Sequence, residues 1–238
     1  MPKTSTPKDP LPSLSTRLRD LVDDNRLVSK SDPENPGPLS LTLVPGDPDC
    51  GVFIMVGDNA SGKSLMVRLL ASRLNADKVE PLQVSMRYRT SSGMHRVFMF
   101  GSDEDESTGA VSLHAVKGGM RTCQERMEPA WLMLDEPDIG LAEGYCLALG
   151  EYLARFGNDL DGNGQKALGL VTHSKPLVQG LVKHLRRRPH FLVAGPRHAG
   201  MGLEQWLADN TPLGLDELLQ LNDKGHQTWR AVEALLKS

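Results

Sequence analysis

Apolar positions along the chain follow two patterns, one typical of buried strands and one typical of amphipathic helices. Continuous apolar runs predict buried strands at 51–56, 131–134, 167–171 and 191–194. Between these runs, apolar residues recur every three to four positions, which predicts helices such as the one over 63–74. Strands that alternate with helices indicate an α/β fold with a mostly parallel central sheet flanked by helices.

Two smaller features are expected on this core. Residues 82–88 alternate apolar and polar side chains, and a turn at Ser91-Ser92-Gly93 leads to a second strand at 96–100, which predicts an antiparallel hairpin region. An apolar stripe after Ser107 predicts one helix in a reduced helical subdomain.

The ends of the chain predict helices outside this core. Ser13 is a candidate cap for a helix within 11–27, and two closing helices are expected near Leu215 and Trp229. We therefore expect three parts, divided as follows: an N-terminal tail and helix (1–38), a core domain (39–196) and a C-terminal helical appendage (197–238).

Composition narrows the class of protein without identifying it. The net charge is -3, so composition alone does not indicate a nucleic-acid-binding protein. The three cysteines are scattered, which fits reduced thiols better than a disulfide framework. The N-terminus is polar with no apolar run, and no stretch is long enough to span a bilayer. We expect a soluble, cytoplasmic protein without a membrane partner.

A glycine-rich loop follows the first buried strand and opens the helix at 63–74. Its sequence fits G-x-x-x-x-G-K-[ST], a loop whose backbone N–H groups surround phosphate oxygens at a helix N-terminus. The lysine reaches the β- and γ-phosphates, and the serine hydroxyl binds Mg²⁺. The residues expected to bind the nucleotide are Gly57, Asp58, Asn59, Ala60, Ser61, Gly62, Lys63 and Ser64. We predict that the chain binds MgATP and hydrolyses it.

Two carboxylates follow the strand at 131–134. A P-loop enzyme needs a carboxylate at the end of a neighbouring strand to hold Mg²⁺, and Asp135 is in that position. Glu136, one residue later, is a candidate general base for the attacking water. The alternative for this segment alone is a solvated acidic turn at the end of a strand.

These motifs resemble those of compact, soluble ABC-type ATPases, which are related to AAA and SMC proteins. The phosphate loop is similar to Walker A and residues 134–137 to Walker B. The resemblance covers about 39–196 and implies that His173, just after the apolar run at 167–171, contacts the γ-phosphate. It also implies that residues 138–141 correspond to the D-loop at a dimer seam.

The signature motif of that family is less well matched. The resemblance places it at 107–110, where Ser107 and Gly109 precede a helix and would cap the γ-phosphate of the partner subunit's nucleotide. Thr108 and Ala110 depart from the usual pattern, and an ordinary serine N-cap explains Ser107 as well. The resemblance thus implies an ATP-dependent homodimer with ATP and Mg²⁺ as cofactors, acting as a conformational switch in DNA repair or defence.

Other functions remain open at this point. One is an ATP-binding regulatory module that gates a protein partner such as a nuclease with little hydrolysis, and another is a small-molecule kinase. A GTPase is less favoured because no N/T-K-x-D segment is present. The basic run at 183–188 indicates DNA contact only weakly, since most such runs are solvated faces. Among the residues before the phosphate loop, there is no aromatic candidate for stacking on adenine. We expect packing or a partner surface to explain Trp206 and Trp229.

Overall fold

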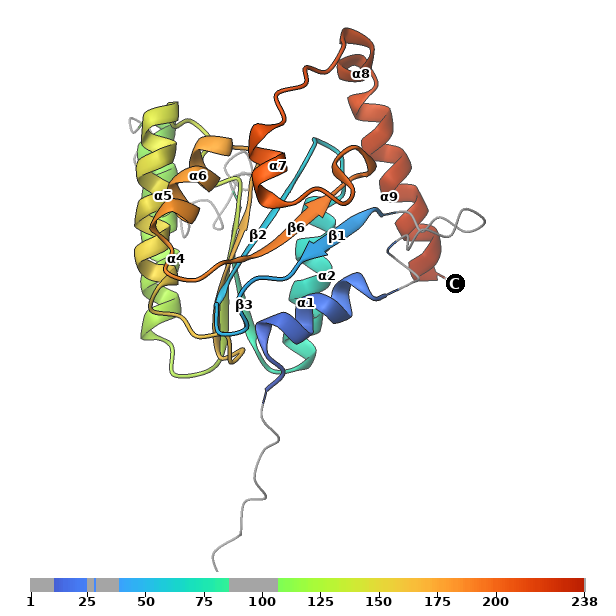
Figure 1. The fold of residues 1–238 in the computed structure, drawn as a ribbon. Coiled ribbons are helices and arrows are strands. Elements are labelled where there is room, and N and C mark those ends of the chain that lie inside the picture. The colour runs from blue at the N-terminus through green and yellow to red at the C-terminus, as the bar shows by residue number, and fades with distance from the viewer. Residues whose placement is uncertain (1–10, 25–27, 29–38, 86–106, 238) are drawn as a thin grey trace, which may run out of the picture.

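The structure is a computed structural model that describes residues 11–24, 28, 39–85 and 107–237. Within these residues, six strands form one sheet in the order β1-β6-β2-β5-β4-β3 (Figure 1). The strands are β1 (Leu41–Val44), β2 (Val52–Gly57), β3 (Glu80–Ser85), β4 (Ala130–Asp135), β5 (Lys166–Val171) and β6 (His190–Ala194). Only β1 and β6 pair antiparallel; the other neighbours are parallel. The predicted α/β fold with a mostly parallel sheet is confirmed.

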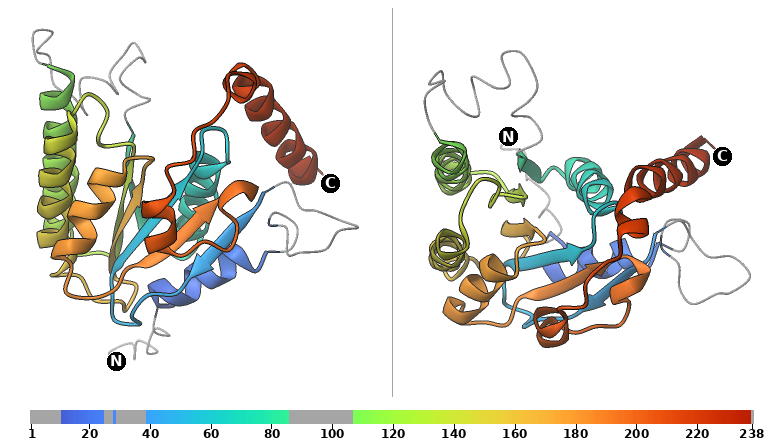
Figure 2. Two further views of the ribbon diagram at one scale, coloured as in Figure 1. Left: turned by 45° about the horizontal axis from the view of Figure 1, so that its top comes forward. Right: turned by 90° about the horizontal axis from the view of Figure 1, so that it is seen from above.

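Helices cover both faces of this sheet (Figures 1 and 2). The helices packed on one face are α4 (Thr108–Glu125), α5 (Glu143–Gly157), α6 (Lys175–His184) and α7 (Leu203–Ala208). The other face carries α1 (Leu14–Val22), α2 (Lys63–Ala76) and part of α9 (Leu221–Lys237). Because both faces are covered, the central strands β2 and β4 are buried along their whole length, as their apolar runs predict.

The strand order decides which loops meet. β5 lies between β2, which leads into the phosphate loop, and β4, which ends at Asp135. In the register of the sheet, Asp135 is opposite Val171 on one side and Ser85 on the other. Since the carboxyl ends of parallel strands share one edge of a sheet, the segments after β2, β4 and β5 lie next to one another there.

Smaller features of the fold, such as helix caps and short helices, agree with the sequence predictions at some positions and differ at others. Ser13 caps α1, as predicted, through its side-chain oxygen and the N–H of Thr16. The turn and second strand of the expected hairpin, at 91–93 and 96–100, lie outside the described residues. α7 was not predicted as a separate helix; it is only six residues long, and its N-cap is Gly202, which has no side chain to mark a helix start.

The end of the chain adds two short elements before α9. They are η2 (Pro196–His198) and α8 (Leu215–Leu219). Among the helices in the described ranges, none is both long enough and apolar enough to cross a bilayer.

Candidate nucleotide-binding site

The phosphate loop joins β2 to α2, as its sequence predicts. Gly57 has a φ of 144°, and a Cβ at this position would lie 2.1 Å from the carbonyl oxygen of Ala194, so only glycine fits. Ala60 has a φ of 61°, an uncommon left-handed conformation for a residue with a side chain. These conformations close the loop in front of the N-terminus of α2, where backbone N–H groups and the helix dipole favour an anion.

Lys63 is the first residue of α2 and its side chain is buried within the loop. Its ammonium donates hydrogen bonds to the carbonyl oxygens of Gly57 and Asp58, each at 2.8 Å. Its Nζ also lies 3.3 Å from Nδ1 of His173. The lysine therefore links the loop that follows β2 to the residue that follows β5.

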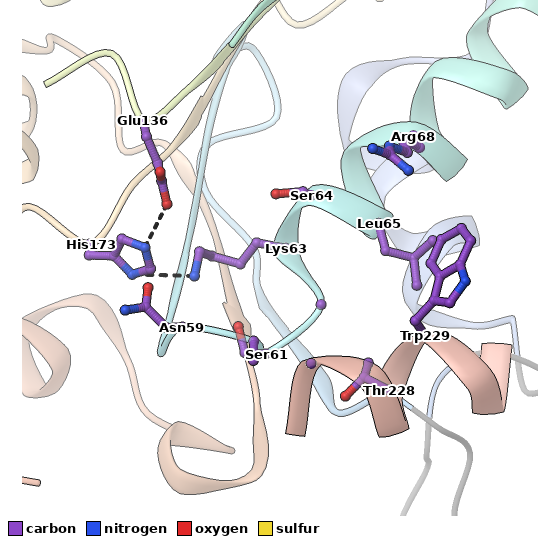
Figure 3. Close-up of a pocket in the computed structure, with 13 residues that line it drawn as sticks. Asn59, Ser61, Lys63, Ser64, Leu65, Arg68, Glu136, His173, Thr228 and Trp229 are labelled. Atoms are coloured by element: carbon purple, nitrogen blue, oxygen red, sulfur yellow. Dashed lines mark hydrogen bonds and ion pairs between the residues drawn. The ribbon is translucent and has the colours of Figure 1, made fainter. Parts of the chain in front are cut away.

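Glu136 and His173 form the next link (Figure 3). Oε1 of Glu136 lies 2.7 Å from Nε2 of His173. Glu136 has a φ of 56°, a conformation that costs a residue with a side chain about 1–2 kcal/mol. Its backbone N–H donates to the carbonyl of Val171 at 2.8 Å, which holds this conformation against the end of β5. Backbone strain of this kind is concentrated at functional sites.

The ring of His173 is held from both sides. Its Nδ1 also lies 2.9 Å from the carbonyl oxygen of Gly57. With a proton on Nε2 alone, the ring donates to Glu136 and accepts from Lys63; with both nitrogens protonated, it donates to Glu136 and to Gly57. In either form the imidazole is fixed between the carboxylate and the phosphate loop.

Ser64 and Asp135 lie beside this group and fit the requirements of a magnesium site. The Ser64 hydroxyl is 3.3 Å from Oδ2 of Asp135, to which the Ser85 hydroxyl also donates at 3.2 Å. No cluster of three or more His, Cys, Asp or Glu residues suited to a metal occurs in the described ranges. Mg²⁺ does not need one, because it usually takes one or two carboxylates together with water and substrate phosphates.

Ser85 is a site residue that the sequence analysis missed. It ends β3, and the register of β3 and β4 places it opposite Asp135. The sequence predicted a strand over 82–88, which put Ser85 in its interior, so no signal marked it as the end of a strand. Its partner strand could not be identified from the sequence, since strand order is set by tertiary packing.

Residues beyond 196 also reach the phosphate loop. Arg197 and His198 each approach the carboxylate of Asp58, both at 3.9 Å. His198 also lies 3.2 Å from Asp209. Hydrogen bonds from Thr211 lower the pKa of Asp209 to about 2, with smaller contributions from His198 and Arg197. The C-terminal segment is thus part of the surroundings of the phosphate loop.

A cavity of about 210 Å³ lies along the phosphate loop (Figure 3). Residues 59–64, Glu136 and His173 line it, and so do Leu65 and Arg68 of α2. The helix α9 contributes Gly225, Thr228 and Trp229. Trp229 was expected to serve packing or a partner surface, so its place in this cavity was not foreseen.

The candidate signature motif lies elsewhere. Neither Ser107 nor Gly109 lines the cavity at the phosphate loop of its own chain. The Ser107 side chain accepts a hydrogen bond from the N–H of Ala110 at 3.3 Å, so it acts as the N-cap of α4. A Cβ on Gly109 would lie 2.9 Å from the carbonyl oxygen of Gly140, so close packing by itself requires a glycine here. Binding of a partner's nucleotide by this segment stays a prediction.

Two further groups of residues have structural roles. In the basic run, Arg187 donates to the carbonyls of Asp49 and Leu160, and Arg188 pairs with Asp47. These arginines therefore tie loops of the same chain together. The three cysteines are buried free thiols. Burial raises the pKa of each of them, so they stay protonated near neutral pH.

Comparison with known proteins gives little further information. No protein-family model matches the sequence, and no curated protein matches it. Among solved structures, the chain is similar to the Aeropyrum pernix ORC1 protein, solved in complex with DNA, with 21% sequence identity and a TM-score of 0.35. The match covers 65% of this chain and 41% of that chain. A likeness this distant carries no inference about function.

Proposed function

We propose that the chain is an ABC-type ATPase that binds and hydrolyses MgATP between two copies of itself. The observation that carries this proposal is the contact series from Lys63 through His173 to Glu136, at the carboxyl edge of the sheet. It brings together the lysine of a phosphate loop, a histidine and a carboxylate from three separate segments. Such an arrangement suits phosphoryl transfer to water, in which catalysis is mainly positioning and electrostatic stabilisation.

Each residue then has a defined task. The loop N–H groups and Lys63 bind the phosphates, while Ser64 and Asp135 would hold a magnesium ion, which would neutralise charge on the phosphate oxygens. Glu136 accepts a proton from the attacking water, and His173 contacts the γ-phosphate and keeps Glu136 in place.

Contacts also connect the site to the surface where a second copy would bind. The Ser112 hydroxyl on α4 donates to the carbonyl of Ile139 at 2.7 Å. The Thr172 hydroxyl, next to His173, donates to Asp138 at 2.7 Å. The N-terminus of α4 and the loop 138–141 are therefore coupled to the end of β5. A partner nucleotide capped at Ser107 would influence His173 through this route.

ATP-driven closing of two protomers suits a switch in DNA repair or defence, the processes with which the resembling family is associated. A second candidate is an ATP-binding regulatory module with little hydrolysis, which gates a partner such as a nuclease. The close packing of Gly109 on Gly140 favours it, because this packing accounts for the glycine without a phosphate ligand.

The test uses Glu136→Gln, which keeps the size of the side chain and removes the base. With MgATP, light scattering should show a dimer of this variant, and phosphate release should fall at least about 100-fold from the wild-type rate. Glu143→Gln, the same change at an exposed position outside the cavity, serves as the control and should behave as wild type.

The outcomes separate the hypotheses. Unchanged phosphate release in Glu136→Gln would remove Glu136 as the base. A monomer in the presence of bound MgATP would rule out the ATP-sandwiched dimer. Negligible phosphate release by the wild type, together with an ATP-dependent dimer, would favour the regulatory module.

A further inference from the structure

The C-terminal helix α9 is held against the phosphate loop. Val232 is fully buried in the core cluster that includes Leu39 and Met66, and it anchors the helix to the α2 face of the sheet. A Cβ on Gly225 would be 3.7 Å from the Cβ of Ala60. Cγ2 of Thr228 is 3.8 Å from where a Cβ on Gly62 would lie. Two successive turns of α9 therefore lie directly on the loop.

Trp229 is placed by these contacts at the edge of the cavity. Its side chain is 47% exposed, and it lines the cavity together with Leu65 and Arg68 of α2. Figure 3 shows all three on the α2 side of the loop, away from Glu136 and His173. A large aromatic side chain left half exposed beside a ligand cavity presents apolar surface that a flat ligand can cover.

The other tryptophan that the sequence places near the C-terminus behaves differently. Trp206 is only 4% exposed and packs against Phe191, with ring centroids 6.2 Å apart. Packing accounts for Trp206 completely. It does not account for Trp229, whose helix is anchored instead by Val232.

The direction of a bound nucleotide follows from the polar end of the cavity. Lys63 reaches the β- and γ-phosphates in a loop of this kind, and the catalytic carboxylate lies beyond the γ-phosphate. Glu136 and His173 therefore mark the γ-phosphate end. The nucleoside must extend from the opposite end, where Leu65, Arg68 and Trp229 lie.

We propose that Trp229 is the platform on which the nucleobase stacks, so that α9 supplies the base-binding part of the site. This inference rests on the proposed binding of ATP. The indole face covers one face of the base, Leu65 adds apolar contact, and the guanidinium of Arg68 adds a cation near the ribose and the α-phosphate. Stacking is tolerant of base identity because every base has a π-face, so the platform favours nucleoside triphosphates over inorganic polyphosphate without selecting adenine.

The test compares MgATP with magnesium tripolyphosphate, which has the phosphates and lacks the base. Affinities are measured by calorimetry for the wild type, Trp229→Ala and Trp229→Phe. We expect Trp229→Ala to bind MgATP about tenfold more weakly and tripolyphosphate as well as the wild type does. Trp229→Phe keeps an aromatic face and should retain most of the affinity for MgATP.

The control is Tyr145→Ala, which removes an aromatic side chain that is 70% exposed on α5, outside the cavity. It should leave both affinities unchanged. Tripolyphosphate binding also shows whether the phosphate loop of Trp229→Ala is intact, so a folding defect cannot imitate the expected result.

Results that would contradict the platform differ from those that would contradict the nucleotide site. Unchanged MgATP affinity in Trp229→Ala would overturn the role of Trp229 as the platform. An equal loss of affinity for MgATP and for tripolyphosphate would overturn it too. In both cases the proposed phosphate site would stand. A wild-type protein that binds neither ligand would overturn the proposed nucleotide site itself, and the platform with it.

Discussion

The two edges of the central sheet differ in what their residues do. At the carboxyl edge, Lys63, Glu136 and His173 are held in contact, and Glu136 has a left-handed backbone conformation. At the amino edge, polar groups tie loops to the core. The N–H of Gly46 donates to Nδ1 of His190 at 3.0 Å, and the indole of Trp131 donates to a loop carbonyl at 3.1 Å.

This difference indicates a division between activity and stability. The carboxyl edge keeps polar side chains and backbone strain that folding alone would not favour. At the amino edge, these hydrogen bonds satisfy Nδ1 of His190 and the indole N–H of Trp131, and losing such a partner would cost about 1–3 kcal/mol. Substitutions at the carboxyl edge should therefore affect turnover more than folding, and those at the amino edge the reverse.

The largest effect that tests this comparison is expected for His173→Ala. The change removes the proposed contact to the γ-phosphate and the hydrogen-bond partner of Glu136, so kcat for phosphate release should fall about 100-fold. The free energy of unfolding should change little, because the side chain is partly exposed. Steady-state phosphate release and denaturant unfolding measure the two effects.

His190→Asn provides the matching substitution at the other edge. Its amide oxygen can still accept from Gly46, and the residue lies at the start of β6, away from the phosphate loop. We expect near wild-type turnover in this variant. A loss of turnover as large as that of His173→Ala would contradict the division between the two edges.

A smaller effect concerns pH. Burial lowers the pKa of His190 below its ordinary value of 6.5. Its Nδ1 accepts from Gly46, so protonation would turn this acceptor into a donor facing another N–H. The unfolded chain binds the proton and the folded chain does not. Stability should therefore decrease as pH falls from 6.5 toward the lowered value, by at most about 1.4 kcal/mol per pH unit.

Unfolding free energies measured from pH 7 to pH 5 check this prediction. His190→Asn should reduce the loss of stability over that range. His114→Gln, which changes an exposed histidine on α4, is the control and should keep the wild-type profile. An unaltered profile in His190→Asn would show that another group controls stability in acid.

The sequence predicted the fold and the position of residues 57–64 between a strand and a helix, for physical reasons. Buried strands and amphipathic helices leave strong patterns, and the phosphate loop needs glycine and lysine at fixed positions. Asp135 and His173 could be placed because each follows an apolar run that ends at the same edge of the sheet.

The rest of the site depends on contacts between distant segments. Ser85 meets Asp135 only because β3 pairs with β4. Arg197 reaches Asp58, and Trp229 reaches the cavity, through the path of the chain after β6. Neither the spacing nor the residue types in this region indicate such proximity. The C-terminal helices were therefore predicted as elements, without their role at the site.

The central claim, that this chain binds nucleoside triphosphate through residues 57–64, is tested most directly by Lys63→Ala. MgATP affinity is measured by calorimetry for this variant, for the wild type and for Lys183→Ala, which removes an exposed lysine on α6. We expect Lys63→Ala to bind about 100-fold more weakly and Lys183→Ala to match the wild type. Equal MgATP affinity in all three proteins, or no binding by the wild type, would contradict the claim.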